Sequence, residues 1–232
     1  MILRLLPPTL VNQIAAGEVV ERPSSVVKEL VENAVDAGAP RIDIALGDGG
    51  CTRIAVTDDG RGMTAPELAL AVERHATSKL PDDDLLNIGF LGFRGEALPA
   101  IGSVSRLTLT SRARGAADAW TLRVEGGRVS EPAPAALTTG SRVEVRDLFY
   151  ATPARLKFLK AVRTEAAHVR DVVERLAMAH PGIAFTLIDD ERTVLRVGTT
   201  SGDLFGARSA RLAAVLGREF GENALPVDAE RE

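Results

Sequence analysis

The segment of residues 42–56 constrains the fold most, because its hydrophobic residues follow the period of a β-strand on both sides of a turn. Apolar and polar residues alternate over 42–46, an Asp-Gly-Gly sequence follows at 48–50, and the alternation resumes at Ile54 and Val56. A repeat of two places the apolar side chains on one face of each strand, and a glycine-containing turn joins the strands as a hairpin. The protein therefore contains a sheet with antiparallel pairing.

A helix is predicted immediately before this hairpin. Apolar residues recur at helical spacing over residues 26–37. We expect Ser24 or Ser25 to cap the N-terminus of this helix and Gly38 to end it. The side of the helix opposite its apolar residues carries four polar side chains, Glu29, Glu32, Asn33 and Asp36.

Further segments of the chain continue this mixture of strands and helices. The predicted strands are 107–111, 120–124, 142–146, 183–188 and 193–197, and the predicted helices are 66–74, 164–179 and 209–216. Many strands in hairpin order with a few helices indicate an α+β fold with helices on one face of a mixed, mainly antiparallel sheet. Two stretches fit no regular structure: we expect 76–95 to be a long mobile loop and 125–140 a surface excursion.

Composition limits the class of protein. The chain is 45% hydrophobic and 26% charged, which is typical of a folded globular protein. Cys51 is the only cysteine, which excludes an intramolecular disulfide and a multi-cysteine zinc site and fits a reducing compartment. Because no apolar run approaches the about 18 residues that a membrane span needs, we expect a cytoplasmic protein.

Charge gives only a local indication of nucleic-acid binding. The formal net charge of −4 provides no global attraction to DNA, so any contact must come from a patch. Residues 142–170 contain seven basic and three acidic residues. Solvated helix faces explain this excess as well as DNA contact does, and both interpretations stay open. The candidates for contact with DNA phosphates are Arg155, Lys157 and Lys160.

The two common nucleotide-binding motifs are absent. The sequence has no P-loop, and the Gly-Arg-Gly at 60–62 lacks the third glycine of the dinucleotide fingerprint. On the predicted helix, however, Glu29 and Asn33 lie one turn apart on one side. A carboxylate there could activate water while an amide oxygen binds Mg²⁺, although a solvated helix face explains the same pattern.

Two glycine-rich segments could complete a nucleotide site. Asp58 ends an apolar strand and is followed by Gly60 and Gly62, so its carboxylate could accept the adenine amino group while the glycines admit a flat ring. An ordinary turn also explains this segment. The second segment, 92–95, leads into a predicted helix whose first N–H groups favour phosphate oxygens, and Pro99 is tolerated in its first turn.

These elements resemble, in order and approximate spacing, the GHKL ATPases, a group that includes DNA gyrase B, Hsp90, sensor histidine kinases and MutL proteins. Four longer motifs resemble those of the MutL family of mismatch repair proteins. They are NQIAAGEVV at 12–20, RHATSK at 74–79, GFRGEAL at 92–98 and DLFYATPAR at 147–155. Four long motifs in one order, within residues 7 to about 160, make a chance match negligible.

The resemblance implies a two-layer α/β sandwich of the GHKL (Bergerat) type. It implies an ATP-binding domain over 1–201 and the start of a transducer subdomain at 202–232. Glu29 would be the catalytic general base, Asn33 the Mg²⁺ ligand and Asp58 the acid that binds adenine. The other implied nucleotide contacts are Gly60, Gly62, Thr77, Ser78, Lys79, Gly92, Phe93, Arg94, Gly95, Glu96, Ala97, Leu98 and Ser141. Ser141 stands where the family usually has threonine, so the hydroxyl is kept and a methyl is lost.

The resemblance also implies a function. The protein would be a weak Mg-dependent ATPase in which ATP closes a lid over 76–95, orders the N-terminal arm and drives dimerisation, and hydrolysis resets the switch. The implied partners are a mismatch-recognition protein of the MutS type, DNA held through its phosphates, a second copy of the chain and downstream repair factors, with the protein acting at the nucleoid. The family's second subdomain contributes a lysine to the γ-phosphate, and the chain ends at Glu232 soon after entering it, so we expect little turnover from these 232 residues.

Three other functions fit parts of the pattern. A histidine kinase needs a phospho-accepting helix upstream, and too few residues precede the first motif to form one. A nuclease needs acidic or Cys/His metal clusters, and none stands out in the sequence, where the three histidines are scattered. A scaffold that binds nucleotide or DNA without turnover stays open.

Overall fold

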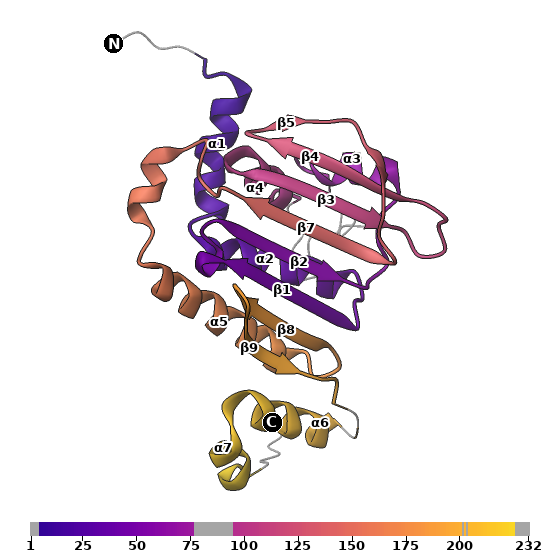
Figure 1. Cartoon of the computed structure of the whole chain (residues 1–232), viewed down its shortest axis with the longest axis vertical. Helices are drawn as coiled ribbons and strands as arrows, with labels where there is room; N and C mark the ends of the chain where they lie inside the picture. The colour runs from indigo at the N-terminus through magenta and orange to yellow at the C-terminus, as the bar shows by residue number, and fades with distance from the viewer. Residues whose placement is uncertain (1–4, 77–94, 201, 203, 226–232) are drawn as a thin grey trace, which may run out of the picture.

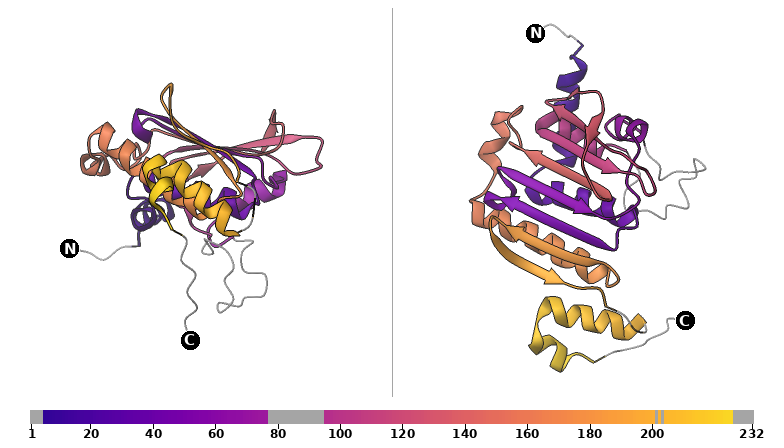
Figure 2. Two further views of the ribbon diagram at one scale, coloured as in Figure 1. Left: turned by 90° about the horizontal axis from the view of Figure 1, so that it is seen from below. Right: turned by 45° about the vertical axis from the view of Figure 1, so that its right-hand side comes forward.

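The computed structural model describes residues 5–76, 95–200, 202 and 204–225, and every structural statement below concerns these residues. One mixed sheet forms a layer, and helices cover one of its two faces (Figures 1 and 2). No helix in these ranges is long and apolar enough to cross a membrane.

The sheet is mainly antiparallel. Its strands are β1 (Arg41–Gly47), β2 (Arg53–Asp58), β3 (Arg106–Arg112), β4 (Ala119–Glu125), β5 (Arg128–Val129), β6 (Ala133–Ala135), β7 (Gly140–Arg146), β8 (Ala184–Asp189) and β9 (Arg192–Val197). Their order is β5-β4-β3-β7-β2-β1-β8-β9, with β6 paired to β4. Only the β1–β8 pair is parallel among these pairings. The predicted fold class is therefore confirmed.

The helical layer contains most of the segments that line the candidate site. Its helices are α1 (Pro8–Val19), α2 (Pro23–Asp36), α3 (Ala65–Ala71), α4 (Ala97–Val104), α5 (Val162–Ala179), α6 (Leu204–Leu216) and α7 (Arg218–Asn223), with 3-10 turns η1 (Asp48–Gly50) and η2 (Pro153–Phe158). The predicted hairpin is β1 and β2, in which Ile44 lies opposite Val56. Their inward side chains pack with Val27 and Val31 of α2, all of them buried. This packing fixes α2 on the sheet and leaves its polar side at the edge of the contact.

The start of α2 differs from the prediction. The helix begins at Pro23, and the extended residue Arg22 stands at the N-cap, so Ser24 and Ser25 lie in the first turn. Proline favours the first helical position because its φ angle is already helical and its missing N–H needs no acceptor there. The serine cap was therefore a wrong prediction, whereas Gly38 follows the helix with a φ of 69° as a C-terminal glycine should.

Two further segments are more regular than predicted. The stretch 125–140 contains β5 and β6, two short strands that pair with β4 through Val129 and Ala133. Their brevity and the edge proline Pro134 hide the alternation that identifies longer strands. The NQIAAGEVV motif lies largely within α1, which the hydrophobic pattern did not predict. The predicted mobile loop 76–95 lies, apart from its two end residues, outside the described residues.

A buried arginine attaches α6 to the rest of the domain. The Arg211 side chain is fully buried and donates hydrogen bonds to the carbonyl oxygens of Ala177 (2.9 Å), Pro181 (2.9 Å), Ile183 (2.7 Å) and Gly198 (2.6 Å). These carbonyl groups belong to the end of α5, to the turn and residue before β8 and to the residue after β9. The C-terminal helices are therefore held by charge-assisted hydrogen bonds as well as by apolar packing.

Candidate functional site

A cavity of about 1030 Å³ lies in the helical layer beside the ends of two strands. Its wall includes Glu29 and Asn33 of α2, Asp58 of β2, Ser141 of β7 and Leu98 of α4. Ligand sites in proteins range from roughly 300 to 1000 Å³, so the space suits a molecule of nucleotide size. The fold thus brings together residues that the sequence places more than a hundred positions apart.

The α2 side of the cavity carries three carboxylates, those of Glu29, Glu32 and Asp36, and one cation, Lys28. Lys28 Nζ lies 2.7 Å from Glu32 Oε1 and 3.6 Å from Glu29 Oε1. The closer partner of the lysine is therefore Glu32, which was part of the predicted polar stripe but was given no role. The Glu29 side chain is 29% exposed and lines the cavity one turn from Asn33, so its oxygens can reach a bound water or ligand.

Asp58 lines the cavity at the end of β2 and is buried. Burial raises the pKa of this carboxyl to about 6. Hydrogen bonds from the backbone N–H groups of Gly60 and Ser141 lower the pKa, but their effect is smaller than that of burial. The Gly60 N–H to Asp58 Oδ1 distance is 2.9 Å. A buried carboxylate without a cation gains from a further hydrogen-bond donor, and the amino group of an adenine ring is such a donor.

Two glycines allow the backbone around Asp58 to pack closely. Gly62 has a φ of 65°, and a Cβ atom there would lie 1.9 Å from the carbonyl oxygen of Arg112. Gly140 has a φ of 72°, and a Cβ atom there would lie 2.0 Å from the carbonyl oxygen of Asp58. A larger residue at either position would separate the strand ends that form this wall. Sequence reasoning singled out Gly62 and gave Gly140 no role in the site.

A serine outside the predicted set supports this wall. Ser111 Oγ accepts a hydrogen bond from the Met63 N–H (2.8 Å) and donates one to the Gly140 carbonyl oxygen (3.0 Å). It also lies 2.8 Å from Ser141 Oγ, its neighbour in the β3–β7 register. The hydroxyl predicted at Ser141 is therefore part of a buried network. Ser111 could be found only from its position opposite Ser141 on the neighbouring strand, and spacing along the sequence does not show which residues lie opposite one another.

The N-terminus of α4 forms another part of the wall. Gly95, Glu96, Ala97 and Leu98 line the cavity, and α4 starts at Ala97 without a side-chain cap. The first N–H groups of a helix have no acceptor within the helix and favour anions. Pro99 lies in the first turn, as predicted. Six other predicted contacts lie outside the described residues: Thr77, Ser78, Lys79, Gly92, Phe93 and Arg94.

The three predicted DNA-binding residues lie in or just after η2 but differ in their surroundings. Arg155 Nη1 donates a hydrogen bond to the Val20 carbonyl oxygen (2.9 Å), and its guanidinium lies over the Phe149 ring, 5.5 Å from the centroid. Arg155 therefore holds the end of α1 in place. Lys157 and Lys160 are exposed in and just after η2, and none of the three lines the cavity.

The fold and the cavity agree with one known class of protein. Residues 21–145 match the family described as histidine kinase-, DNA gyrase B- and HSP90-like ATPase. This match covers more than half of the chain, so the chain belongs to this family of ATPases. The matched segment includes Glu29, Asn33, Asp58 and Ser141.

Within this class the chain is similar to MutL proteins, as its motifs predicted. It is 70% identical to the DNA mismatch repair protein MutL of Rhodospirillum rubrum and 68% identical to that of Paramagnetospirillum magneticum, over the whole chain. It spans 37% and 38% of the length of these relatives.

Solved structures show the same fold. The MutL ATPase domain of Aquifex aeolicus complexed with ADP has a TM-score of 0.70 and 30% identity, covering 85% of this chain and 70% of that one. The N-terminal domain of a DNA repair protein has a TM-score of 0.74 and 25% identity, covering 91% of this chain and 61% of that one. The GHKL-type sandwich and the resemblance to the MutL family are therefore confirmed.

Proposed function

We propose that the chain binds ATP in this cavity and hydrolyses it with the help of Mg²⁺, as the nucleotide switch of a MutL-type mismatch repair protein. The observation that carries the proposal is that Glu29, Asn33, Asp58 and the N-terminus of α4 line a single cavity. Membership of an ATPase family and similarity to a MutL ATPase domain complexed with ADP support it.

Each wall of the cavity suits one part of ATP. Asp58 accepts a hydrogen bond from the adenine amino group, while the N–H groups of Ala97 and Leu98 face the phosphates. In the described residues no group of three or more His, Cys, Asp or Glu side chains could hold a metal ion. A Mg²⁺ ion at Asn33 would therefore share its coordination with phosphate oxygens and water, as Mg²⁺ commonly does.

Glu29 is the proposed general base. It would accept a proton from the water that attacks the γ-phosphate, and the α4 N–H groups would offset charge on the transferred group. A Mg²⁺ ion held at Asn33 would supply further positive charge there. Lys28 forms an ion pair with Glu32. This pair keeps the positive charge of Lys28 next to the carboxylate of Glu29. The lid and phosphate-loop residues 77–79 and 92–94 stay predictions from the sequence motifs.

The N-terminal arm is the proposed dimerisation element. Leu5, Leu10, Val11 and Ile14 are exposed apolar side chains of residues 5–14, a pattern that indicates a contact surface. This arm packs on α4 through α1, and the N-terminus of α4 lines the cavity. Phosphates bound at α4 would therefore bias the position of the arm, and a second copy of the chain would cover its apolar residues.

The remaining proposals concern the whole protein. We propose the domain division 1–201 and 202–232, contact of DNA phosphates with Lys157 and Lys160 beside η2, and action in the cytoplasm at the nucleoid. A mismatch-recognition protein of the MutS type and downstream repair factors are the proposed partners, because the relatives described above are named DNA mismatch repair proteins. Weak turnover with Mg²⁺ belongs to this same proposal.

Nucleotide-dependent stability of the purified chain tests the proposal. ADP with Mg²⁺ at about 100 times its Kd should raise the free energy of unfolding by about 2.7 kcal/mol. Asn33→Ala should reduce the part of this gain that depends on Mg²⁺, and Asp58→Ala should reduce all of it. Lys157→Ala, outside the cavity, is the matched control and should behave as wild type. No stabilisation by ADP or ATP would overturn the proposal.

A further inference from the structure

The face of the sheet opposite the helices is rich in arginine. Two observations identify the strand residues on this open face: buried and exposed positions alternate along each strand, and the strand register shows which residues lie side by side. Its charged members are nine arginines, Arg41, Arg53, Arg106, Arg112, Arg123, Arg128, Arg142, Arg146 and Arg196, and three acids, Asp43, Glu125 and Glu144. A chain with a net charge of −4 therefore concentrates positive charge on one face of the sheet. This is the face that the helices leave uncovered in Figure 2.

Three of these arginines form a row across adjacent strands. Arg146 of β7 lies directly opposite Arg53 of β2 on one side and Arg106 of β3 on the other. Adjacent strands are about 4.8 Å apart, and like charges directly opposite one another destabilise a sheet. Carboxylates offset part of this repulsion, because Arg53 and Arg146 pair with Glu144 and Arg106 pairs with Asp147 and Glu125. A phosphate on the solvent side of the row would add acceptors for the guanidinium N–H groups that these carboxylates leave free.

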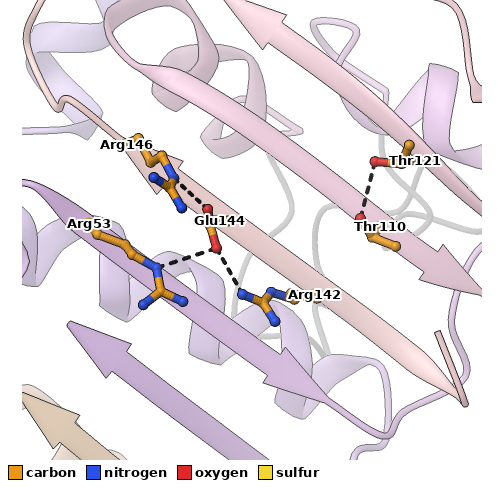
Figure 3. A network of polar contacts seen from close by, with 6 residues as sticks. All are labelled: Arg53, Thr110, Thr121, Arg142, Glu144 and Arg146. Carbon is orange, nitrogen blue, oxygen red and sulfur yellow. Dashed lines mark hydrogen bonds and ion pairs between the residues drawn. The ribbon is translucent and has the colours of Figure 1, made fainter. Parts of the chain in front are cut away.

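Glu144 fixes part of this row in place. Its carboxylate accepts hydrogen bonds from Arg142 Nη2 (2.9 Å), Arg146 Nε (2.6 Å) and Arg53 Nε (3.4 Å), as Figure 3 shows. The Glu144 side chain is 16% exposed, whereas the three arginine side chains are 36% to 60% exposed. The single negative charge of Glu144 neutralises only one of the three guanidinium groups around it, so the cluster keeps a net charge of two positive units. The exposed arginines keep N–H groups on the solvent side that can donate to an anion.

This arrangement reduces the entropic cost of binding an anion. An arginine that is already held in one rotamer on a rigid strand loses little freedom when a second acceptor arrives. Arg106 is held in a similar way, because its Nε lies 3.0 Å from Asp147 Oδ2 and its guanidinium lies 4.7 Å from the Tyr150 ring centroid. The open face thus presents guanidinium groups in fixed positions.

The other residues of the face indicate which anion binds. None of the exposed large hydrophobic side chains of the described residues lies on β1–β4 or β7–β9, whereas protein interfaces have apolar or aromatic anchors at their centre. Trp120 and Phe185 occupy inward positions of their strands, so these strands offer no ring on which bases of a single strand could stack. The favoured ligand is therefore a regular array of phosphates.

We propose that this arginine face binds the phosphate backbone of duplex DNA. The row adjoins the segment already proposed to contact DNA, because β7 ends at Arg146 and the chain runs through residues 147–152 into η2. Phosphate contacts of this kind fix the position of a duplex without reading its sequence. The proposal adds a second DNA surface and does not depend on ATP hydrolysis.

Salt-dependent binding of a labelled duplex to the purified chain tests this proposal. The variant combines Arg53→Gln, Arg142→Gln and Arg146→Gln, and a second variant adds Glu144→Gln so that the mostly buried carboxylate is not left without its cations. Each lost phosphate contact reduces the slope of log Kobs against log salt by about 0.9, so we expect both variants to lose roughly 2 to 3 units of slope. The matched control carries Arg175→Gln, Arg208→Gln and Arg218→Gln on the helices and should keep the wild-type slope.

The outcomes separate this surface from the η2 segment. If only Lys157→Gln with Lys160→Gln lowers the slope, the arginine face is not a DNA contact, while the DNA contact of the proposed function stands. If the arginine variants bind duplex as wild type does but lose binding to polyglutamate, the face takes an acidic protein and the proposal is overturned. Stabilisation by ADP, measured on the same samples, reports separately on the nucleotide site.

Discussion

Asp58 and Glu144 lie on neighbouring strands of one sheet, but they point to opposite faces and have opposite electrostatic surroundings. Asp58 faces the helical layer, where burial raises its pKa to about 6. Burial would also raise the pKa of Glu144, but hydrogen bonds from Arg142 and Arg146 and the charge of Arg53 lower it to about 2. The difference arises from the presence or absence of cations around each carboxylate.

This comparison separates two binding chemistries within one sheet. On the cavity side a negative charge is costly, so the wall at Asp58 favours a ligand that donates hydrogen bonds. On the open side positive charge is in excess, so the face favours a ligand that carries negative charge. A sheet with one covered and one uncovered face can therefore serve two ligands without one interfering with the other.

The largest effect should come from a carboxylate on the cavity side. In the full-length protein, Glu29→Ala should lower ATP turnover by roughly 10²–10⁴ while ATP binding persists, because a general base acts mainly on the transition state. Glu144→Gln is the control from the open face and should leave steady-state phosphate release unchanged. Equal turnover in wild type and the Glu29 variant would remove Glu29 from the role of base.

Asp58 should make the folded chain less stable at higher pH. Its pKa is raised, so the folded state holds the proton more tightly than the unfolded state, and this stability is lost as pH rises from about 4 through about 6. The loss should be about 2 to 3 kcal/mol, and Asp58→Asn should abolish it. Urea unfolding across this pH range measures the effect, with the exposed Asp118→Asn as control; identical pH profiles for wild type and Asp58→Asn would refute the assignment.

Glu144 should give a smaller effect of the opposite sign. Its pKa is lowered, so it contributes stability above its ordinary pKa of 4.5, and this contribution is lost as pH falls toward 2. At neutral pH, Glu144→Gln should reduce the free energy of unfolding by roughly 1 to 2 kcal/mol after solvent screening. The difference from wild type should shrink in acid. Glu174→Gln, which breaks an exposed pair with Arg170, should cost less; a larger loss there would contradict the comparison.

The two regions also differ in how well the sequence predicted them. Glu29, Asn33 and Asp58 belong to local segments, so spacing and hydrophobic periodicity predicted the elements that carry them. Their grouping in one nucleotide site was implied by the resemblance to the GHKL ATPases. The Glu144 network and the Ser111–Ser141 contact depend on strand register between segments far apart in the chain. Local spacing contains no information about that register, and neither contact was predicted.

The sequence did not predict those helices and strands that lack a clear alternation of apolar and polar residues. Leu10, Val11 and Ile14 of α1 are exposed, so the helix has no clear apolar face for a periodicity argument to detect. The strands β5 and β6 are only two and three residues long, too short for alternation to establish. At α2 the serine cap failed because Pro23 already suited the first helical position.

The parallel pair of β1 and β8 has a consequence for how the chain folds during synthesis. β1 can pair with β2 as soon as the hairpin leaves the ribosome, but its other edge gains a partner only when Ala184–Asp189 emerges. At roughly 5 to 20 residues per second, the nascent chain carries an unpaired strand edge for on the order of ten seconds. During that interval the apolar residues Ile42, Ile44 and Leu46 lie next to an open edge that can pair with another chain. Pairing of β8 with β1 is therefore the step at which this edge stops being available to another chain.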